Sequence, residues 1–197
     1  MFREEKFGIL CYRVFLFIIR RGYSLFLSLS LGGSLNCRFD FGAKIIGSKN
    51  ISIGTRFYAG KNLWIESVLL GRNCGEIKIY DDVAVSDSVH IASAKYVEIG
   101  AGTLIGSSVM ITDHDHGSYV NSRDDFLIAP NRRPLNVKGN VIIGKNVWIC
   151  DGVKILSGVV IGNNSVVAAN SVVVSSVPDN CLVAGIPAKV IKFFNVN

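Results

Sequence analysis

An aliphatic residue recurs at every sixth position through the last third of the chain. One row is formed by Ile143, Ile149, Ile155, Ile161, Val167 and Val173, and a second row, two residues earlier, begins with Val141, Val147, Val153 and Val159. A period of six fits neither an α-helix nor a continuous strand, but the two rows point the same way, as alternate residues of a short strand do. Each hexad is therefore predicted to be one short strand followed by a corner.

The same register occurs upstream with two offsets. The spacing is 14 residues from Ile65 to Ile79 and 8 residues from Ile91 to Ile99, and small insertions at corners would produce both values. Because three hexads close a triangle, we expect coils of about 18 residues whose strands stack in parallel on those of the next coil. The chain from about 45 to 179 thus predicts an all-β solenoid of about six coils.

Glycine and asparagine mark the corners between these strands. The pattern Gly-x-Asn recurs at Gly60–Asn62, Gly71–Asn73, Gly144–Asn146 and Gly162–Asn164. Both residue types tolerate the positive φ that a sharp corner requires. Only 18% of the 197 residues are charged, below the roughly 25% of ordinary soluble domains. Part of the surface is therefore expected to be covered by something other than water.

The N-terminal segment, residues 1–40, lies outside the repeat. Apolar residues fall at helical spacing over Phe7, Leu10, Cys11, Val14, Phe17 and Ile18, which predicts an amphipathic helix. Because Arg13, Arg20 and Arg21 interrupt this stretch, it lacks the run of about 18 uncharged residues that spans a bilayer. One interpretation of the basic, apolar character is peripheral association of residues 1–35 with an anionic membrane. The alternative is a helix that covers the open end of the β-domain or packs on a sister subunit.

Charge and cysteine content narrow the partners and the compartment. The net charge of +6 suits an anionic ligand or a membrane surface, and the basic residues form no aromatic-interleaved stripe, so nucleic acid is not an expected partner. The odd set Cys11, Cys37, Cys74, Cys150 and Cys181 contains no C-x-x-C pair, which predicts buried thiols in a reducing compartment. No small-residue cleavage site follows the N-terminal apolar stretch. We expect a cytoplasmic protein, with the inner face of the cytoplasmic membrane as its docking surface.

A long segment breaks the repeat between Ile111 and Ile143. Residues 113–139 carry no aliphatic register, but they contain His114 and His116, two of the three histidines. A projecting segment of this length in a compact domain is usually functional. Histidine accepts a proton near neutral pH, as a general base acting on a sugar hydroxyl must. Residues 113–139 are therefore the candidate catalytic loop.

Three stretches outside the hexads resemble one enzyme family. They are Val109 to Tyr119, Val147-Trp148-Ile149, and Ser171 to Ile191 with its VPDN and AGIPAKVI elements. The chain resembles the hexapeptide-repeat acyltransferases, above all the maltose and galactoside acetyltransferases and the O-acetyltransferases of bacterial surface polysaccharides. The resemblance implies a left-handed parallel β-helix and a homotrimer with active sites between subunits. It divides the chain into the N-terminal helical segment, a β-helix over 41–181 and a C-terminal tail over 182–197.

The resemblance also implies a mechanism and a site. The catalytic histidine of the family lies five residues after the inward aliphatic that opens the loop, which is His116 when counted from Ile111, with His114 as the alternative. The base would take the proton of the acceptor hydroxyl as its oxygen attacks the thioester of acetyl-CoA, the expected co-substrate, and no metal is expected. The implied acceptor-binding residues are Ser86, Asp87, Asp113, Asp115, Tyr119 and Trp148. The implied acetyl-CoA-binding residues are Trp148, Asp151, Ala169, Val174, Lys189 and Lys192.

Several functions remain open at this point. The favoured one is O-acetylation of a sugar hydroxyl in a bacterial surface glycan (O-antigen, capsule or exopolysaccharide) or its lipid-linked precursor. A small-sugar or nucleotide-sugar N-acetyltransferase is the alternative. The family often has asparagines where this chain has Ser86-Asp87-Ser88, which leaves the identity of the acceptor open. A γ-type carbonic anhydrase would need three histidine ligands, which His90, His114 and His116 provide in number but not in spacing. A non-enzymatic β-helix scaffold is the fourth possibility.

Overall fold

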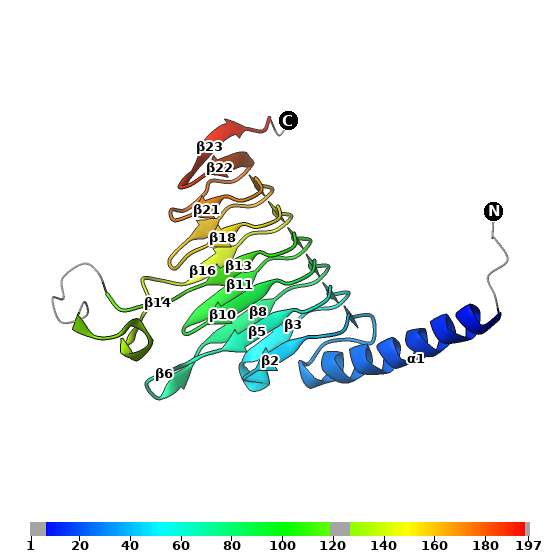
Figure 1. Ribbon diagram of the computed structural model, residues 1–197. Coiled ribbons are helices and arrows are strands. Elements are labelled where there is room, and N and C mark those ends of the chain that lie inside the picture. The colour runs from blue at the N-terminus through cyan, green and yellow to red at the C-terminus, as the bar shows by residue number, and fades with distance from the viewer. Residues whose placement is uncertain (1–6, 119–126, 196–197) are drawn as a thin grey trace.

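The computed structural model describes residues 7–118 and 127–195, and most of them lie in or between short strands. Most of the strands form three large sheets, which the chain visits in turn (Figure 1). The eight-stranded sheet contains β1 (Arg38–Phe39), β4 (Tyr58–Ala59), β9 (Ala84–Val85), β12 (Leu104–Ile105), β17 (Trp148–Ile149), β20 (Val166–Val167), β22 (Cys181–Gly185) and β23 (Ala188–Phe193). The six-stranded sheet contains β2 (Lys44–Ile46), β5 (Trp64–Ser67), β10 (His90–Ser93), β13 (Met110–Thr112), β18 (Lys154–Ile155) and β21 (Val172–Val173). The five-stranded sheet contains β3 (Ile51–Ile53), β8 (Glu76–Ile79), β11 (Tyr96–Ile99), β16 (Val141–Ile143) and β19 (Val160–Ile161).

The hexad register is visible in the pairing of these strands. Ile149 of β17 is paired in parallel with Ile105 of β12 and with Val167 of β20. The predicted inward row from Ile143 to Val173 is at most 1% exposed at every position. Stacked aliphatic side chains therefore fill the space between the three sheets, as the period of six predicts.

Two serines interrupt the second aliphatic row and are nevertheless buried. Ser165 and Ser171 are 0% and 1% exposed. The hydroxyl of Ser165 donates to the carbonyl of Pro178 at 2.7 Å, and the hydroxyl of Ser171 accepts the N–H of Gly185 at 3.1 Å. A buried hydroxyl with a partner costs little, so the row continues through both positions.

Glycine and asparagine lie at the corners between strands, as expected, but for different reasons. In three of the four Gly-x-Asn patterns it is the asparagine that adopts positive φ, at 56° in Asn62 and 55° in Asn146 and Asn164, whereas at Gly71–Asn73 it is the glycine, at 64°. The glycines Gly144 and Gly162 have ordinary φ, but a Cβ on Gly162 would lie 2.3 Å from the backbone nitrogen of Asp179 in the next coil. The prediction that both residues supply positive φ was therefore wrong for these glycines, which are needed because the coils approach closely.

The N-terminal segment forms one helix, α1 (Phe7–Ser30), that packs on the β-domain only near its C-terminal end (Figure 1). Ser24 and Ser28 are buried, and the hydroxyl of Ser24 accepts the N–H of Phe39 at 2.8 Å. The phenol oxygen of Tyr23 accepts the N–H of Ala43 at 3.0 Å. This part of α1 covers the first strand of the eight-stranded sheet, as one of the two interpretations of the segment predicts.

The outer part of α1 projects away from the sheets. Its exposed apolar side chains are Ile9, Leu10, Tyr12, Val14, Phe15, Phe17, Ile18 and Ile19. At 100° per residue these positions surround the helix, so the apolar surface is wider than the single stripe expected from the sequence. Among the residues described, no helix has both the length and the apolarity needed to cross a bilayer.

The other departures lie at the two ends of the domain. The segment expected as a C-terminal tail forms β23, which pairs antiparallel with β22 and extends the eight-stranded sheet. Only Cys37 and Cys181 are buried, so the prediction that all five thiols are buried was wrong for Cys11 and Cys74, which are exposed, and for Cys150, which is half-buried. Cys11 lies on the projecting part of α1, and Cys74 lies in a hairpin outside the hexad register.

Three insertions occur at the same corner, between the six-stranded and the five-stranded sheet. The first is a hairpin of β6 (Leu69–Leu70) and β7 (Asn73–Cys74), and the second is the turn from β10 to β11. The third is the long segment between β13 and β16, which contains the short antiparallel pair of β14 (Asp115–His116) and β15 (Leu135–Asn136). Short 3₁₀ turns lie at Ser48–Asn50 and Pro130–Arg132. The predicted catalytic loop thus leaves from the corner where the coils below it are also enlarged (Figure 1).

Candidate active site

The base of the projecting loop is fixed to the β-domain on both sides. His116 of β14 is paired with Leu135 of β15, and Asp115 with Asn136. On the return, the N–H of Lys138 donates to the hydroxyl of Ser157 at 2.9 Å, and that hydroxyl donates to the carbonyl of Asp113. The residues that begin and end the loop are therefore held at the corner.

Asp113 is the buried anchor of this arrangement. Its side chain is 0% exposed. Oδ1 accepts the N–H of Ala94 at 2.7 Å and lies 3.0 Å from Nδ1 of His114, while Oδ2 accepts from the Ser93 hydroxyl at 2.9 Å and from the N–H groups of Lys95 and Tyr96 at 2.8 Å each. The turn of the coil below is thus wrapped around one carboxylate. A carboxylate with this many donors is stabilised in its charged form.

The pKa of Asp113 reflects two opposing effects. Burial raises the pKa, because the charged form is removed from water. The hydrogen bonds from His114, from the backbone of Ala94 and Lys95 and from Ser93 lower it, and together they hold the pKa below the usual value for aspartate. Asp113 is therefore ionised at neutral pH.

The ionised carboxylate fixes the orientation of His114. The imidazole is 13% exposed, and its Nδ1 also lies 3.3 Å from the hydroxyl of Thr112. A neutral imidazole beside a carboxylate places its proton on the nitrogen that faces the carboxylate, here Nδ1, which leaves a lone pair on Nε2. The tautomer follows from the hydrogen-bond network rather than from observed hydrogens. This is the arrangement of an oriented general base.

His116 has a different environment. Its side chain is exposed on β14, on the outer part of the loop. The neighbouring carboxylate of Asp115 forms an ion pair at 2.9 Å with Lys138 across the loop. The two histidines proposed as base are thus distinguished by burial and by the buried carboxylate at Nδ1 of His114.

The expected acceptor residues are distributed over several places. Tyr119 lies outside the residues that the structure describes. Ser86 and Asp87 lie at a corner, where Oδ1 of Asp87 accepts the N–H of Lys61 at 2.7 Å. Asp113 cannot touch an acceptor, because its carboxylate is completely buried, and we reassign it to orienting His114.

The expected acetyl-CoA residues are exposed, most of them on or next to the eight-stranded sheet, whereas Val174 follows β21 of the six-stranded sheet. Trp148 is 51% exposed on β17, between Leu104 and Val166 of the flanking strands. Ala169 and Val174 are exposed, and so are Lys189 and Lys192 on β23. Oδ1 of Asp151 accepts the N–H of Ser107 at 2.5 Å, the same corner contact that Asp87 makes. Trp148 and the two lysines belong to the eight-stranded sheet, whereas His114 follows the six-stranded sheet, so one chain does not bring them together.

Ser93, Thr112 and Ser157 were not predicted as part of the site. One signal for Asp113 was present in the sequence, because Ile111 points inward and Asp113, two residues later, must point inward as well.

The third histidine, His90, contacts other side chains. Its Nε2 is 2.9 Å from Oε1 of Glu66, and its ring is stacked on that of Trp64 with the ring centres 4.1 Å apart. No group of three His, Cys, Asp or Glu side chains suited to a metal occurs in residues 7–118 and 127–195.

Comparisons with known proteins show the family to which this chain belongs. The sequence profile described as "Bacterial transferase hexapeptide (six repeats)" matches residues 140–175. WbbJ of Escherichia coli K12 is 44% identical over 163 residues, which are 81% of this chain and 81% of WbbJ. The chain belongs to the bacterial hexapeptide-repeat transferases. WbbJ carries the provisional name of a lipopolysaccharide biosynthesis O-acetyl transferase.

Solved structures agree with this membership. The hexapeptide-repeat acetyltransferase VCA0836 from Vibrio cholerae, solved with acetyl-CoA, is 25% identical, with a TM-score of 0.58 over 90% of this transferase and 88% of that chain. A mutant of the N-acyltransferase AntD from Bacillus cereus, solved with dTDP and CoA, is 21% identical, with a TM-score of 0.64 over 81% and 82% of the two chains. The first supports an acetyltransferase, and the second shows the shared fold. This transferase is an acyltransferase, as the sequence predicts.

Proposed function

We propose that this transferase moves an acetyl group from acetyl-CoA to a sugar hydroxyl in a bacterial surface glycan or its lipid-linked precursor. The observation that carries the proposal is the 44% identity to WbbJ over most of both chains, because the name of WbbJ specifies O-acetyl transfer in lipopolysaccharide biosynthesis. The His114–Asp113 pair supports it, because a sugar hydroxyl is a weak nucleophile and needs a base.

The pair suits direct transfer. Nε2 of His114 takes the proton of the acceptor hydroxyl while the hydroxyl oxygen attacks the thioester carbonyl of acetyl-CoA. The C–S bond then breaks, the proton passes from the imidazolium to the departing thiolate, and the products are an acetyl ester and CoA. The ionised Asp113 stabilises the imidazolium that forms during the attack and keeps the ring in the required tautomer.

His114 is our choice for the base in place of His116, which the sequence favours. The reason is orientation, because the carboxylate of Asp113 holds Nδ1 of His114 and the ring is mostly buried. A fixed ring does not have to be ordered when the acceptor binds, so less of the binding energy is lost. His116, with Asp115, is then assigned to binding the acceptor at the exposed side of the loop.

The acetyl-CoA site is proposed at the boundary between two subunits. Trp148, Asp151, Ala169 and Val174 would line the groove for the pantetheine arm, and Lys189 and Lys192 would approach the nucleotide phosphates. Trp148, Lys189 and Lys192 lie on the eight-stranded sheet, whereas His114 follows the six-stranded sheet, so a neighbouring subunit is needed to complete the site. We accordingly propose a homotrimer of left-handed β-helices with one active site at each interface.

Peripheral membrane association is proposed for the N-terminal segment. The outer turns of α1 are apolar on all sides and contain basic but no acidic residues. Exposed apolar side chains together with basic ones favour binding to the headgroup region of an anionic membrane. A lipid-linked glycan is presented at the same interface.

Identification of the product tests the proposal. We would incubate the protein with acetyl-CoA and a panel of lipid-linked oligosaccharides, free sugars and nucleotide-linked amino sugars, and detect acetylated products by mass spectrometry. The expected product is an ester on a glycan, which mild alkali removes. An alkali-stable amide on an amino sugar would show N-acetyl transfer and overturn the proposal.

A further inference from the structure

A hollow lined by arginines lies where α1 meets the β-domain. Arg21 and Arg38, together with Tyr58, line both of two adjoining depressions between α1 and the first strands of the eight-stranded sheet. Arg20 lines the first depression and Arg56 the second. Four guanidinium groups from three different elements of the chain therefore surround one continuous hollow.

The positive charge of the hollow is only partly neutralised. Arg20 lies 3.4 Å from Asp40, and Arg56 forms a two-pronged contact with Asp82. Two cations have no acidic partner among the described residues. Arg21 donates to the carbonyl of Leu35 at 2.8 Å and keeps its other donors, and the Arg38 guanidinium makes no hydrogen bond or ion pair with the described residues. The planar guanidinium matches the oxygens of a phosphate group, which it binds with two parallel hydrogen bonds.

The surroundings of the hollow are apolar on the side of α1. Phe17 lines the first depression, and the exposed apolar turns of α1 continue from it toward the N-terminus. A small soluble anion would use the arginines but not this apolar surface. A phosphate group attached to acyl chains would use both.

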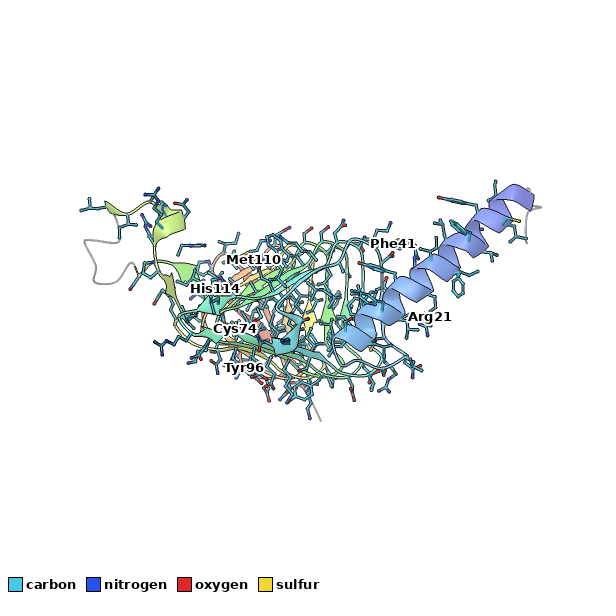
Figure 2. All side chains as sticks on the ribbon, turned by 90° about the horizontal axis from the view of Figure 1, so that it is seen from below. Arg21, Phe41, Cys74, Tyr96, Met110 and His114 are labelled. Atoms are coloured by element: carbon cyan, nitrogen blue, oxygen red, sulfur yellow. The ribbon has the colours of Figure 1, made fainter. Side chains whose placement is uncertain are left out.

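Within one chain, the hollow is separate from the loop that carries His114. Figure 2 shows Arg21 and His114 on opposite sides of the β-domain, with α1 directed away from the loop. An acceptor sugar bound at His114 of this chain would not reach it. The hollow therefore has no assigned part in the acetyl transfer.

We propose that the arginine-lined hollow binds the phosphate group of an anionic phospholipid in the bilayer surface, with the outer turns of α1 lying among the acyl chains. The inference rests on the membrane association proposed above and assigns it a specific lipid site. Arg21 and Arg38 make the principal contacts with the phosphate, and Arg20 and Arg56, held by Asp40 and Asp82, form the walls.

Vesicle binding tests the proposal on the full-length protein. We would measure cosedimentation with vesicles of phosphatidylcholine alone and with vesicles of two parts phosphatidylcholine to one part phosphatidylglycerol. The wild type is expected to bind the anionic vesicles. Arg21→Gln with Arg38→Gln is expected to bind them about thirtyfold more weakly, since each basic side chain near an anionic surface is worth about fivefold in affinity.

Two further variants separate a built site from diffuse charge. Arg21→Lys with Arg38→Lys keeps the charge but loses the two-pronged geometry, so it should also bind more weakly than the wild type. Arg72→Gln with Lys145→Gln removes the same charge outside the hollow and should bind as the wild type does. All of these proteins should unfold in urea about as the wild type does, which shows that they are folded and keeps this test independent of the proposed activity.

Four results would overturn the proposal. They are wild-type binding by the glutamine pair, wild-type binding by the lysine pair, equal weakening in the control pair, and no binding of the wild type to anionic vesicles. If the wild type instead self-associates through α1 and ignores lipid, the occupant of this surface is a second copy of the chain.

Discussion

Replacing Asp113 by asparagine tests the role that we assign to this buried carboxylate. The amide is nearly the same size, but one of its two positions is a donor. If the amide nitrogen takes the place of Oδ2, it opposes the N–H groups of Lys95 and Tyr96. If it takes the place of Oδ1, it opposes the N–H of Ala94 and forces Nδ1 of His114 to become an acceptor. Either orientation leaves at least one buried donor without a partner.

The size of the effect follows from this geometry. An unsatisfied buried donor costs about 1–3 kcal/mol, and the lost charge-assisted hydrogen bonds add to it, so we expect Asp113→Asn to lower the free energy of unfolding by about 2–4 kcal/mol. If the amide nitrogen faces His114, the ring carries its proton on Nε2, and in the other orientation the neutral amide no longer stabilises the imidazolium. In both cases we expect the rate of acetyl transfer to fall by about 100-fold to 10,000-fold.

Urea unfolding and acetyl-CoA turnover measure the two effects separately. The matched control is Asp82→Asn, which breaks the exposed ion pair with Arg56 and should cost less than about 1 kcal/mol. The reasoning is refuted if Asp113→Asn unfolds like the control, or if it is folded and keeps most of the wild-type activity. A variant with wild-type stability but no activity would refute the role of Asp113 in stability and support only its role in catalysis.

Three further predictions concern stability, each followed by urea unfolding. The pKa of Asp113 is lower in the folded protein than the value of about 3.9 in the unfolded chain, so its charge stabilises the fold fully above about pH 3.9 and progressively less below it. The difference in unfolding free energy between wild type and Asp113→Asn should therefore shrink below about pH 4. A difference that stays constant with pH would contradict this. Ser24→Ala leaves the N–H of Phe39 without its acceptor and should cost about 1–3 kcal/mol, whereas the exposed Ser30→Ala should cost far less. Ile149→Ala removes a completely buried side chain from the stacked core and should cost about 2–5 kcal/mol, against less than about 0.5 kcal/mol for the exposed Val160→Ala, and equal costs would be inconsistent with the hexad register.

The repeated part of the fold could be predicted because its constraint is local. Each hexad has the same two inward positions, and these recur every six residues, so a residue such as Ile155 is assigned to the core from its position in the repeat. The corner insertions were also predictable, since the offset from Ile65 to Ile79 corresponds to the hairpin of β6 and β7. The period of six does not show why a corner requires a particular residue. The space between coils, and not backbone conformation, requires glycine at Gly162.

The parts that could not be predicted depend on contacts between distant residues. The donors on Asp113 come from residues 17 to 20 positions earlier in the chain, in a turn whose own sequence carries no motif. The buried serines of α1 meet the first strand through a contact that depends on the angle at which the helix leaves the domain. The arginine hollow likewise combines α1 with β1 and the corner before β4.

The most direct test of the central claim is the turnover of acetyl-CoA with a glycan acceptor by His114→Ala, His116→Ala and the wild type. We predict a base-labile acetyl ester from the wild type, a loss of about two to four decades of rate in His114→Ala, and a smaller loss in His116→Ala. Full activity of His114→Ala, with the large loss in His116→Ala instead, would contradict the assignment of the base. The absence of any glycan ester from the wild type would contradict the proposed function itself.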